Sequence, residues 1–385
     1  MESTSDLKGV RPRGVDLVFF DGGGAHRSGA TSVRDALAAL APELDVRLVN
    51  ATTDVFTHAP ALRWLFDNGI AIYNATLKTE TMYFGDLRSA MRAGAWMSRA
   101  LRPTAVPRVR AYYREGAPRL VVSFIPMHNR MLLEALRLEH PGSRGMVVPV
   151  DFEELFAGYW FDPAAGVEYF CGTDRLVEDA LAAGIAAESV HRVAGMPIHP
   201  RFHAPPLVDV RAERARHGLD PELPTVLVFF GAQGSRRIVD IARWLDLART
   251  RVNLVLLCGH HAEAQAELSR WTSRSPKHVV GFTKDVPLYM RMADVFVGKP
   301  GPLSIFEAMA SGLPVVLWDN PAFSVLFECN LQWVEAAGVG LRVRSVDEVP
   351  LAVARVLRSP EFRRRTAAHG GDATSEIVRA ILERV

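Results

Sequence analysis

The feature that most constrains the fold is a repeated alternation of short apolar runs, glycine or proline breaks and helical stretches along the 385-residue chain. This alternation is typical of parallel α/β units. In the first half, the expected strands are Val15 to Phe20, Val46 to Asn50, Leu120 to Ile125, Met146 to Val150, Glu168 to Cys171 and Val190 to Ala194. In the second half, they are Thr225 to Phe230, Asn253 to Cys258, His278 to Gly281, Val295 to Gly298 and Pro314 to Leu317. The pattern predicts an α/β fold with two open parallel sheets.

Helices and domain boundaries follow from the same pattern. Helices are expected at Thr31 to Leu40, Asn129 to Glu139 and Asp174 to Ala183, between the later strands, and twice over Val346 to Val385. Repeated prolines between Gly195 and Pro224 forbid a continuous helix there. We therefore expect a first domain at residues 1–204, a linker at 205–224, a second domain at 225–345 and C-terminal helices at 346–385.

Charge and cysteine content exclude several classes of protein. Lys plus Arg number 45 and Asp plus Glu number 43, so the net charge of +2 gives no case for a nucleic-acid partner. The three cysteines lie far apart and predict neither a disulfide framework nor a zinc site. The first residues lack the apolar core of a signal peptide, and no run reaches the ~18 apolar residues of a membrane span. We expect a cytoplasmic protein for which contact with a membrane surface stays open.

A glycine turn follows the first expected strand. Gly22, Gly23 and Gly24 allow a tight turn and the close approach of a ligand. The turn does not fit the dinucleotide fingerprint, because Arg27 stands where a third small residue is needed. His26, at its tip, is a candidate general base near neutral pH. The alternative is a solvated histidine in a merely tight loop.

A second glycine loop follows the first strand of the second half. Gly231, Gln233, Gly234 and Ser235 lead into a helix from Arg236, an arrangement suited to holding a diphosphate on backbone N–H groups. The loop lacks the Gly-Lys-Ser/Thr ending of a Walker motif. A purely structural turn is the alternative.

The most specific stretch runs from Lys299 to Glu307. Gly301 precedes a helix that starts near Pro302, and Ser304 and Glu307 share one face of that helix near its amino end. The hydroxyl and the N–H groups suit a phosphate, and the carboxylate one turn on suits the two hydroxyls of a ribose. A capped helix whose first-turn Glu complements the dipole is the alternative.

Taken together, these segments resemble glycosyltransferase family 28, including its lipid and peptidoglycan enzymes. Asp21 to Arg27 resembles the family's Asp-Thr-Gly-Gly-Gly-His-Arg turn, and Lys299 to Pro314 resembles its Lys-x-Gly-x-x-Thr-x-x-Glu-Ala-x-x-x-Gly-Leu-Pro run. Gly231 to Ser235 is similar to the family's Gly-Ser-Gln-Gly loop, and Phe282 and Thr283 lie on a turn that is similar to its uracil-binding turn.

The resemblance implies the GT-B architecture, meaning two Rossmann-like domains that face a cleft, with the acceptor on the first and a UDP-sugar on the second. It implies an inverting transfer of a hexose-type sugar to an acceptor hydroxyl, with His26 as general base or as the residue that orients it. Asp151, after the strand Met146 to Val150, is the helper or the rival base. Helix N-termini can stabilise the departing diphosphate, so no metal or other cofactor is expected.

The sugar-reading pair of the family is missing. Where the family carries Gln-Glu or Gln-Gln, this chain has an apolar stretch, in which Asp319, Ser324 or Glu328 are possible substitutes. Of these, Glu328 is assigned to the donor site, and the identity of the sugar stays open. A catalytically silent nucleotide-sugar-binding protein is an alternative function.

An arginine-rich segment lies between the second and third expected strands. It carries eight arginines from Arg88 to Arg119, with Trp96, Tyr112 and Tyr113 interleaved. Such a segment suits anionic lipid headgroups, each cation near the surface adding ~1 kcal/mol. We therefore expect a lipid-like acceptor at the membrane surface. A solvated helix pair and a soluble acceptor, such as a secondary metabolite, are the alternatives.

Overall fold

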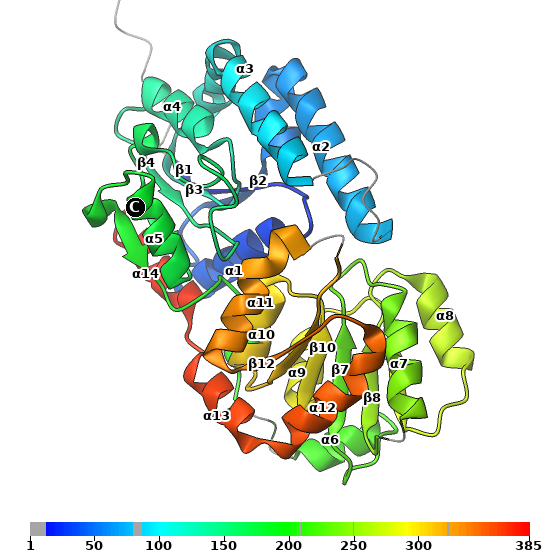
Figure 1. Ribbon diagram of the computed structural model, residues 1–385. Coiled ribbons are helices and arrows are strands. Elements are labelled where there is room, and N and C mark those ends of the chain that lie inside the picture. Colours follow the sequence, from blue (N-terminus) through cyan, green and yellow to red (C-terminus); the bar gives the residue numbers. More distant parts are fainter. Residues whose placement is uncertain (1–12, 80–86, 206, 208, 249, 322–323) are drawn as a thin grey trace, which may run out of the picture. The chain divides into compact units, whose positions relative to one another are not determined.

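The computed structural model describes residues 13–79, 87–205, 207, 209–248, 250–321 and 324–385. The chain forms two compact units, which are described separately. Unit 1 comprises residues 1–75, 82–199 and 373–385, and unit 2 comprises residues 76–81 and 200–372. Each unit contains a six-stranded parallel sheet, which confirms the two open parallel sheets that the sequence predicts and adds one strand to the second (Figure 1).

Unit 1 is a doubly wound α/β sheet with the strand order β2-β1-β3-β4-β5-β6. Its strands are β1 (Arg13–Phe19), β2 (Val46–Asn50), β3 (Pro118–Ser123), β4 (Arg144–Val147), β5 (Glu168–Cys171) and β6 (Val190–Arg192). Its helices are α1 (Ala25–Leu40), α2 (Pro60–Thr79), α3 (Leu87–Glu115), α4 (Asn129–Glu139), α5 (Asp174–Ala182) and α14 (Ala373–Leu382). The inner strands β1, β3 and β5 are mostly buried, because helices cover both faces of a parallel sheet, whereas the edge strands β2 and β6 are mostly only partly buried.

Unit 2 has the strand order β12-β11-β10-β7-β8-β9. Its strands are β7 (Thr225–Phe229), β8 (Asn253–Leu257), β9 (Lys277–Val280), β10 (Val295–Gly298), β11 (Val315–Trp318) and β12 (Gly340–Val343). Its helices are α6 (Val210–Arg216), α7 (Arg237–Leu247), α8 (Ala262–Arg270), α9 (Val286–Met292), α10 (Pro302–Ala310), α11 (Ser324–Ala337), α12 (Val349–Arg358) and α13 (Pro360–Ala368). Strand β12 has no counterpart among the expected strands.

The expected linker at residues 205–224 contains part of the fold of unit 2. Helix α6 lies within it, and the buried guanidinium of Arg214 donates to the carbonyl of Met292 at 2.8 Å and pairs with Asp294 at 2.6 Å. The prolines that interrupt this stretch leave room for a seven-residue helix. The buried Arg214 therefore holds α6 against the end of α9, so this stretch is part of the folded unit and does not act as a linker.

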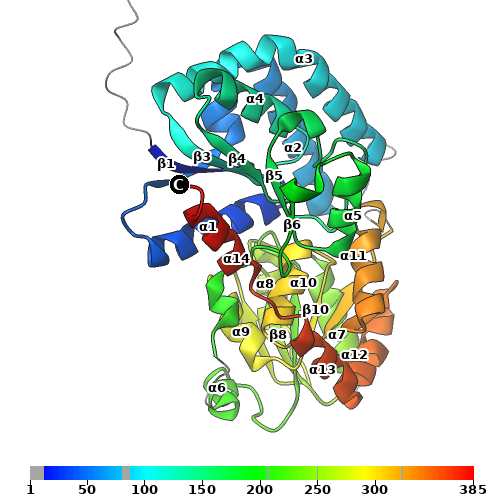
Figure 2. The same cartoon turned by 90° about the vertical axis from the view of Figure 1, so that its left-hand side faces the viewer.

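The C-terminal residues are shared between the two units, whereas the sequence pattern predicts a single group of helices at residues 346–385. Helices α12 and α13 belong to unit 2, and α14 packs beside α1 in unit 1 (Figure 2). Thr374 Oγ1 donates to the carbonyl of Ile198 at 2.6 Å, and Arg384 pairs with Glu168 at 2.6 Å. These contacts explain why the last helix belongs with a sheet that precedes it by about 200 residues of sequence.

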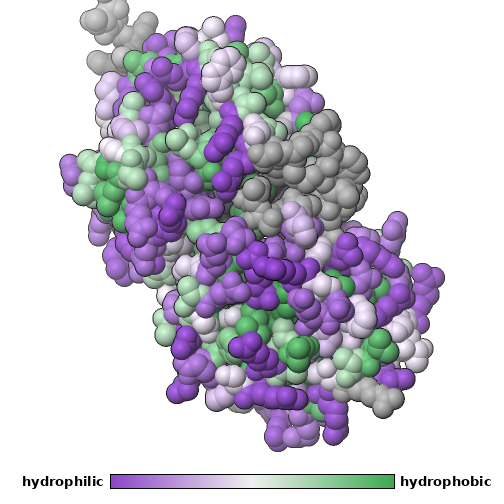
Figure 3. Space-filling model, in the orientation of Figure 1, coloured by the Kyte–Doolittle hydropathy of each residue, from purple (hydrophilic) through white to green (hydrophobic). Residues whose placement is uncertain are grey.

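Side-chain polarity on the surface is ordinary for a globular protein. Hydrophilic residues cover most of the face drawn in Figure 3, and hydrophobic residues form small separate patches on it. Within the described part of the chain, no helix is both long and apolar enough to cross a membrane.

Candidate functional site

The glycine turn of unit 1 connects β1 to α1 and needs its glycines. Gly23 and Gly24 have φ values of 69° and 95°, in the left-handed region that favours glycine. A Cβ at Gly22 would lie 2.4 Å from the ring of Phe20. Asn74 of α2 clamps the turn, because its Oδ1 accepts from Gly23 N at 3.0 Å and its Nδ2 donates to the Asp21 carbonyl at 2.8 Å. The turn is therefore fixed by α2 as well as by its own sequence.

His26 lies in the first turn of α1, which starts at Ala25, six residues before the expected helix start. Its ring is buried against Phe20, and Nδ1 lies 2.6 Å from the carbonyl of Phe124. A carbonyl only accepts, so Nδ1 carries the proton and Nε2 keeps a lone pair. Burial lowers the pKa of His26 to about 4, partly offset by the bond to Phe124. The imidazole is neutral at physiological pH.

Asp151 lies after β4 and is linked to His26 through Trp160. The indole Nε1 of Trp160 donates to Asp151 Oδ2 at 3.0 Å, and the ring of Trp160 lies 6.1 Å from that of His26. Burial raises the pKa of Asp151 to about 6, although the Trp160 bond acts in the opposite direction. The structure thus brings the two candidate bases into one cluster, joined by a tryptophan that the sequence analysis did not identify.

A second carboxylate fixes the loop that carries Trp160. Glu154 accepts hydrogen bonds from the backbone N–H groups of Gly158, Tyr159 and Trp160 at 2.7, 2.9 and 2.7 Å. This side chain holds the indole in position against Asp151. No sequence motif marks Glu154, because the three donors are backbone groups whose arrangement appears only in the folded loop.

The glycine loop of unit 2 lies at the carboxyl end of β7. Gly231 and Gly234 have φ values of 85° and 72°, and a Cβ at Gly234 would lie 2.0 Å from the carbonyl oxygen of Cys258. Gln233 is exposed. Ser235 is buried, and its Oγ accepts from Arg237 N at 3.0 Å, so this hydroxyl caps the start of α7. The loop is thereby shaped for a close ligand approach.

The stretch from Lys299 to Glu307 lies beside this loop, since β10 and β7 are neighbours in the sheet. A Cβ at Gly231 would lie 3.6 Å from Lys299 Nζ, so the ammonium group borders the glycine loop. Gly301 precedes α10, whose amino end has no side-chain cap, and Ser304 Oγ would lie 3.7 Å from a Cβ at Gly301. A cation, a hydroxyl and unpaired N–H groups are therefore gathered at one place, which suits a diphosphate.

Glu307 lies one turn further along α10. Burial raises the pKa of its carboxyl to about 7. Among the described residues, no side chain or backbone group forms a hydrogen bond or an ion pair with this carboxylate. The alternative of a surface Glu that complements the helix dipole predicts a lowered pKa, so the observed environment favours a ligand-binding carboxylate.

Phe282 and Thr283 follow β9 on the same edge of the sheet. The ring of Phe282 is 53% exposed and stacks face to face on His260, with centroids 4.2 Å apart and planes 11° apart. The hydroxyl of Thr283 accepts from Asp285 N at 3.0 Å. Because aromatic faces stack readily on bases, the exposed pair suits a pyrimidine ring.

Glu328 lies in an ion-pair network. Arg342 of β12 donates to both oxygens of Glu328, at 2.9 and 2.8 Å, and also to Asp319 Oδ2 at 2.6 Å. Gln332 donates to Glu328 as well, at 3.0 Å. The carboxylate that is expected in the donor site is thus bound to Arg342, a residue that no sequence motif indicates.

Much of the arginine-rich segment forms the long helix α3. Arg102 pairs with Glu134 at 2.7 Å, and Arg110 and Arg114 pair with Glu139 at 2.9 and 3.2 Å. Trp96 is 70% exposed, whereas Tyr113 belongs to the core. The segment therefore offers fewer free cations and fewer surface aromatics than its sequence alone indicates.

In the described ranges, no group of three or more His, Cys, Asp or Glu side chains is arranged to hold a metal ion.

Two doubly wound α/β units, each with a glycine loop at the carboxyl end of its sheet, define a Rossmann-like class of protein. Residues 225–381 match the glycosyltransferase family 28 C-terminal domain. Residues 225–381 are therefore a glycosyltransferase family 28 C-terminal domain, and the chain has the GT-B fold, in agreement with the family and the fold that the sequence motifs indicate.

Named relatives agree with this family. The chain is 28% identical over 372 residues to monogalactosyldiacylglycerol synthase 1 of Arabidopsis thaliana and 26% identical over 367 residues to the corresponding synthase of Spinacia oleracea. These matches cover 90% and 89% of this chain, which spans just under two thirds, 66%, of each relative. Among solved structures, MurG of Acinetobacter baumannii is similar in fold, with a TM-score of 0.62, 14% identity, and coverage of 97% of this chain and 100% of that one.

Proposed function

We propose that the protein is an inverting glycosyltransferase that moves a hexose-type sugar from a UDP-sugar to a hydroxyl of a lipid-like acceptor. The observation that carries the proposal is Glu307, a partly buried carboxylate with a pKa near 7 beside a glycine loop and an uncapped helix. A partly buried carboxylate without a hydrogen-bond partner costs free energy, and the two hydroxyls of a ribose would satisfy it. Lys299 and the amino end of α10 would bind the diphosphate, and Phe282 would stack on the uracil.

The proposed reaction is a single displacement. The acceptor oxygen attacks the anomeric carbon, the bond from that carbon to the UDP oxygen breaks, and UDP leaves with the electron pair. The hydroxyl proton passes to a base in unit 1. Because the catalytic pKa should lie near the operating pH, Asp151 at about 6 suits this role better than His26 at about 4. We assign proton uptake to Asp151. Because His26 Nε2 could accept only that same proton, we assign to His26 the positioning of Trp160, whose indole N–H is bonded to Asp151.

The lipid-like acceptor is supported by the relatives and by two long helices. The relatives' names specify synthesis of a galactosyl diacylglycerol. In this chain, α2 and α3 expose large apolar side chains at Trp64 (67%) and Trp96 (70%), on helices that also carry arginines. Exposed tryptophans beside cations are typical of a peripheral membrane surface. We propose that these two helices attach the protein to the anionic face of a bilayer.

The activity is tested with a panel of UDP-sugars and with vesicles that contain either diacylglycerol or phosphatidylglycerol as the acceptor lipid. The assay measures released UDP and the glycolipid product, and NMR of the anomeric proton gives the stereochemistry. We expect one UDP-sugar to give a β-linked product. UDP binding without transfer to any acceptor would favour the silent binding protein, and transfer that retains the α configuration would exclude the direct displacement.

Membrane attachment is tested by cosedimentation with phosphatidylglycerol vesicles. The double variant Trp64→Ala/Trp96→Ala should lose most of the bound fraction, whereas Trp244→Ala, which removes an exposed tryptophan of unit 2, should not. Binding should weaken as salt shortens the Debye length from ~10 Å at 0.1 M to ~3 Å at 1 M. A parent protein that stays in the supernatant at low salt would instead support a soluble acceptor.

A further inference from the structure

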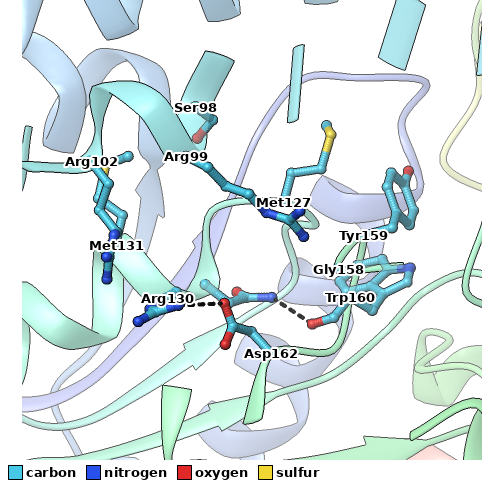
Figure 4. Close-up of a pocket in the computed structure, with 11 residues that line it drawn as sticks. Ser98, Arg99, Arg102, Met127, Arg130, Met131, Gly158, Tyr159, Trp160 and Asp162 are labelled. Carbon is cyan, nitrogen blue, oxygen red and sulfur yellow. Dashed lines mark hydrogen bonds and ion pairs between the residues drawn. The ribbon is translucent and has the colours of Figure 1, made fainter. Parts of the chain in front are cut away.

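A cavity of about 130 Å³ in unit 1 is lined by three guanidinium groups. Arg99 and Arg102 come from α3, and Arg130 comes from the first turn of α4, as Figure 4 shows. The volume is several times the ~30 Å³ that one water molecule occupies. Asp162 supplies the carboxylate that lines the cavity, so its walls carry an excess of positive charge.

The guanidinium groups are incompletely paired. Arg99 donates to the carbonyl of Ala157 at 3.2 Å, and no carboxylate of the described residues forms an ion pair with it. The Nε atom of Arg130 is buried and lacks a hydrogen bond to any described residue. Its terminal nitrogen lies 3.7 Å from Asp162, which is beyond hydrogen-bond distance, whereas Arg102 has a close carboxylate partner in Glu134. Arg99 and Arg130 therefore have guanidinium N–H groups that can donate hydrogen bonds to a ligand.

The amino end of α4 also borders the cavity. Asn129, Arg130 and Met131 form its first turn and line the cavity wall. The preceding residue, His128, gives no side-chain cap, because its Nδ1 lies 2.7 Å from Ser98 Oγ instead. The first turn of this 11-residue helix holds no acidic side chain. An uncapped helix end adds N–H groups and a partial positive charge to the two arginines.

The cavity shares a wall with the candidate catalytic cluster. Trp160 lines the cavity, and its indole N–H is bonded to Asp151. Met127, with a φ of 65°, donates to the Tyr159 carbonyl at 2.5 Å, so the loops on the two sides of the cavity are tied together. A ligand group bound in the cavity would therefore lie close to an acceptor hydroxyl placed at Asp151. The group and the hydroxyl would belong to the same acceptor molecule or to two adjacent molecules.

We propose that this cavity binds the phosphate group of an acceptor lipid. A tetrahedral oxyanion accepts several hydrogen bonds at once, which matches two arginine forks and a helix amino end. A neutral headgroup would leave these donors unpaired. The assignment to the acceptor rests on the proposed function, whereas the phosphate chemistry of the cavity does not.

The test uses titration calorimetry of the full chain with glycerol 3-phosphate and with inorganic phosphate. We expect saturable binding of glycerol 3-phosphate that is at least tenfold weaker in Arg99→Ala, an exposed position where the change leaves the core intact. Arg130→Lys, which keeps the charge but removes the fork, should also weaken it. Arg144→Ala is the matched control, because it removes an exposed cation at the opposite, amino end of the sheet.

The outcomes separate the possible sources of the anion. Absence of saturable binding, or equal binding in the parent and in Arg99→Ala, overturns the proposal. Tighter binding of inorganic phosphate than of glycerol 3-phosphate supports a free-phosphate site and overturns its assignment to the acceptor. UDP is titrated in parallel: if UDP binds and glycerol 3-phosphate does not, the cavity proposal alone fails, and the reverse result leaves the phosphate site standing without the proposed transferase.

Discussion

Glu307 should make the affinity for UDP depend on pH in a defined direction. Burial raises the pKa of its carboxyl from about 4.5 to about 7 in the free protein. Ribose hydroxyls donate hydrogen bonds, so the ionised carboxylate is the form that accepts two of them. The proton must therefore leave Glu307 when UDP binds in this way. Affinity is expected to fall as the pH is lowered through 7.

The magnitude follows from the titration. With a pKa of about 7, the ionised fraction falls from roughly 90% at pH 8 to roughly 10% at pH 6, so the dissociation constant should rise about tenfold over this range. At pH 7, binding should release about half a proton. At pH 8, Glu307→Gln should weaken UDP binding by roughly 10- to 150-fold, which corresponds to ~1.5–3 kcal/mol for hydrogen bonds to a charged group.

Calorimetry at three pH values, in buffers with different ionisation enthalpies, measures both the affinity and the protons released. The terminal phosphate of UDP itself titrates near pH 6, as phosphate monoesters do, so Glu307→Gln supplies the background. Glu263→Gln is the matched control, because Glu263 is an exposed first-turn residue of α8 in the same unit. Equal UDP affinity and equal pH dependence in the parent and in Glu307→Gln would refute the reasoning.

Four further expectations concern catalysis and two glycine positions. Because burial raises the pKa of Asp151 to about 6, kcat/KM should fall about tenfold per pH unit below pH 6. Asp151→Asn should remove this inflection from the pH profile and lower turnover by ~10² to 10⁴. If the inflection persists in Asp151→Asn, another residue is the base. His26→Ala should also lower turnover while leaving UDP affinity within about twofold, and a variant with the parent's turnover would exclude His26 from the mechanism. Trp160→Phe removes the donor that favours ionised Asp151, so the inflection should move to higher pH, and a shift to lower pH would contradict this role. Two glycine variants should differ in thermal unfolding. Gly234→Ala should lower the free energy of unfolding more, because its Cβ would lie 2.0 Å from a backbone oxygen. Gly312→Ala, which has a similar φ of 71° and open space around it, should lower it by only the ~1–2 kcal/mol that a left-handed non-glycine residue costs.

The sequence determined the fold class and the position of most strands. In a parallel sheet covered on both faces, each strand must be a short apolar run between breaks, and that pattern is readable without an alignment. Gly231 and Gly234 could be identified in the same way, because a left-handed backbone strongly favours glycine. Glu307 could be identified from the motif that leads into its helix.

Other elements did not follow from local pattern. Helix α3 contains Pro103 and Pro107, which local rules treat as helix breakers, yet the helix continues through both. Strand β12 begins with Gly340 and contains Arg342, so it lacks the continuous apolar run that predicted the other strands, and it forms because β11 offers an edge to pair with. Tertiary packing decided both elements.

The chemistry of the candidate site was decided almost entirely by tertiary structure. A sequence shows that His26, Asp151 and Glu307 are titratable, but burial by distant residues sets the pKa of each. Trp160 is important because its indole N–H donates to Asp151. Glu328, in α11, is bound by Arg342, which lies in the following strand β12. Desolvation and hydrogen bonding between distant segments depend on three-dimensional proximity, which residue identity and spacing along the chain do not contain.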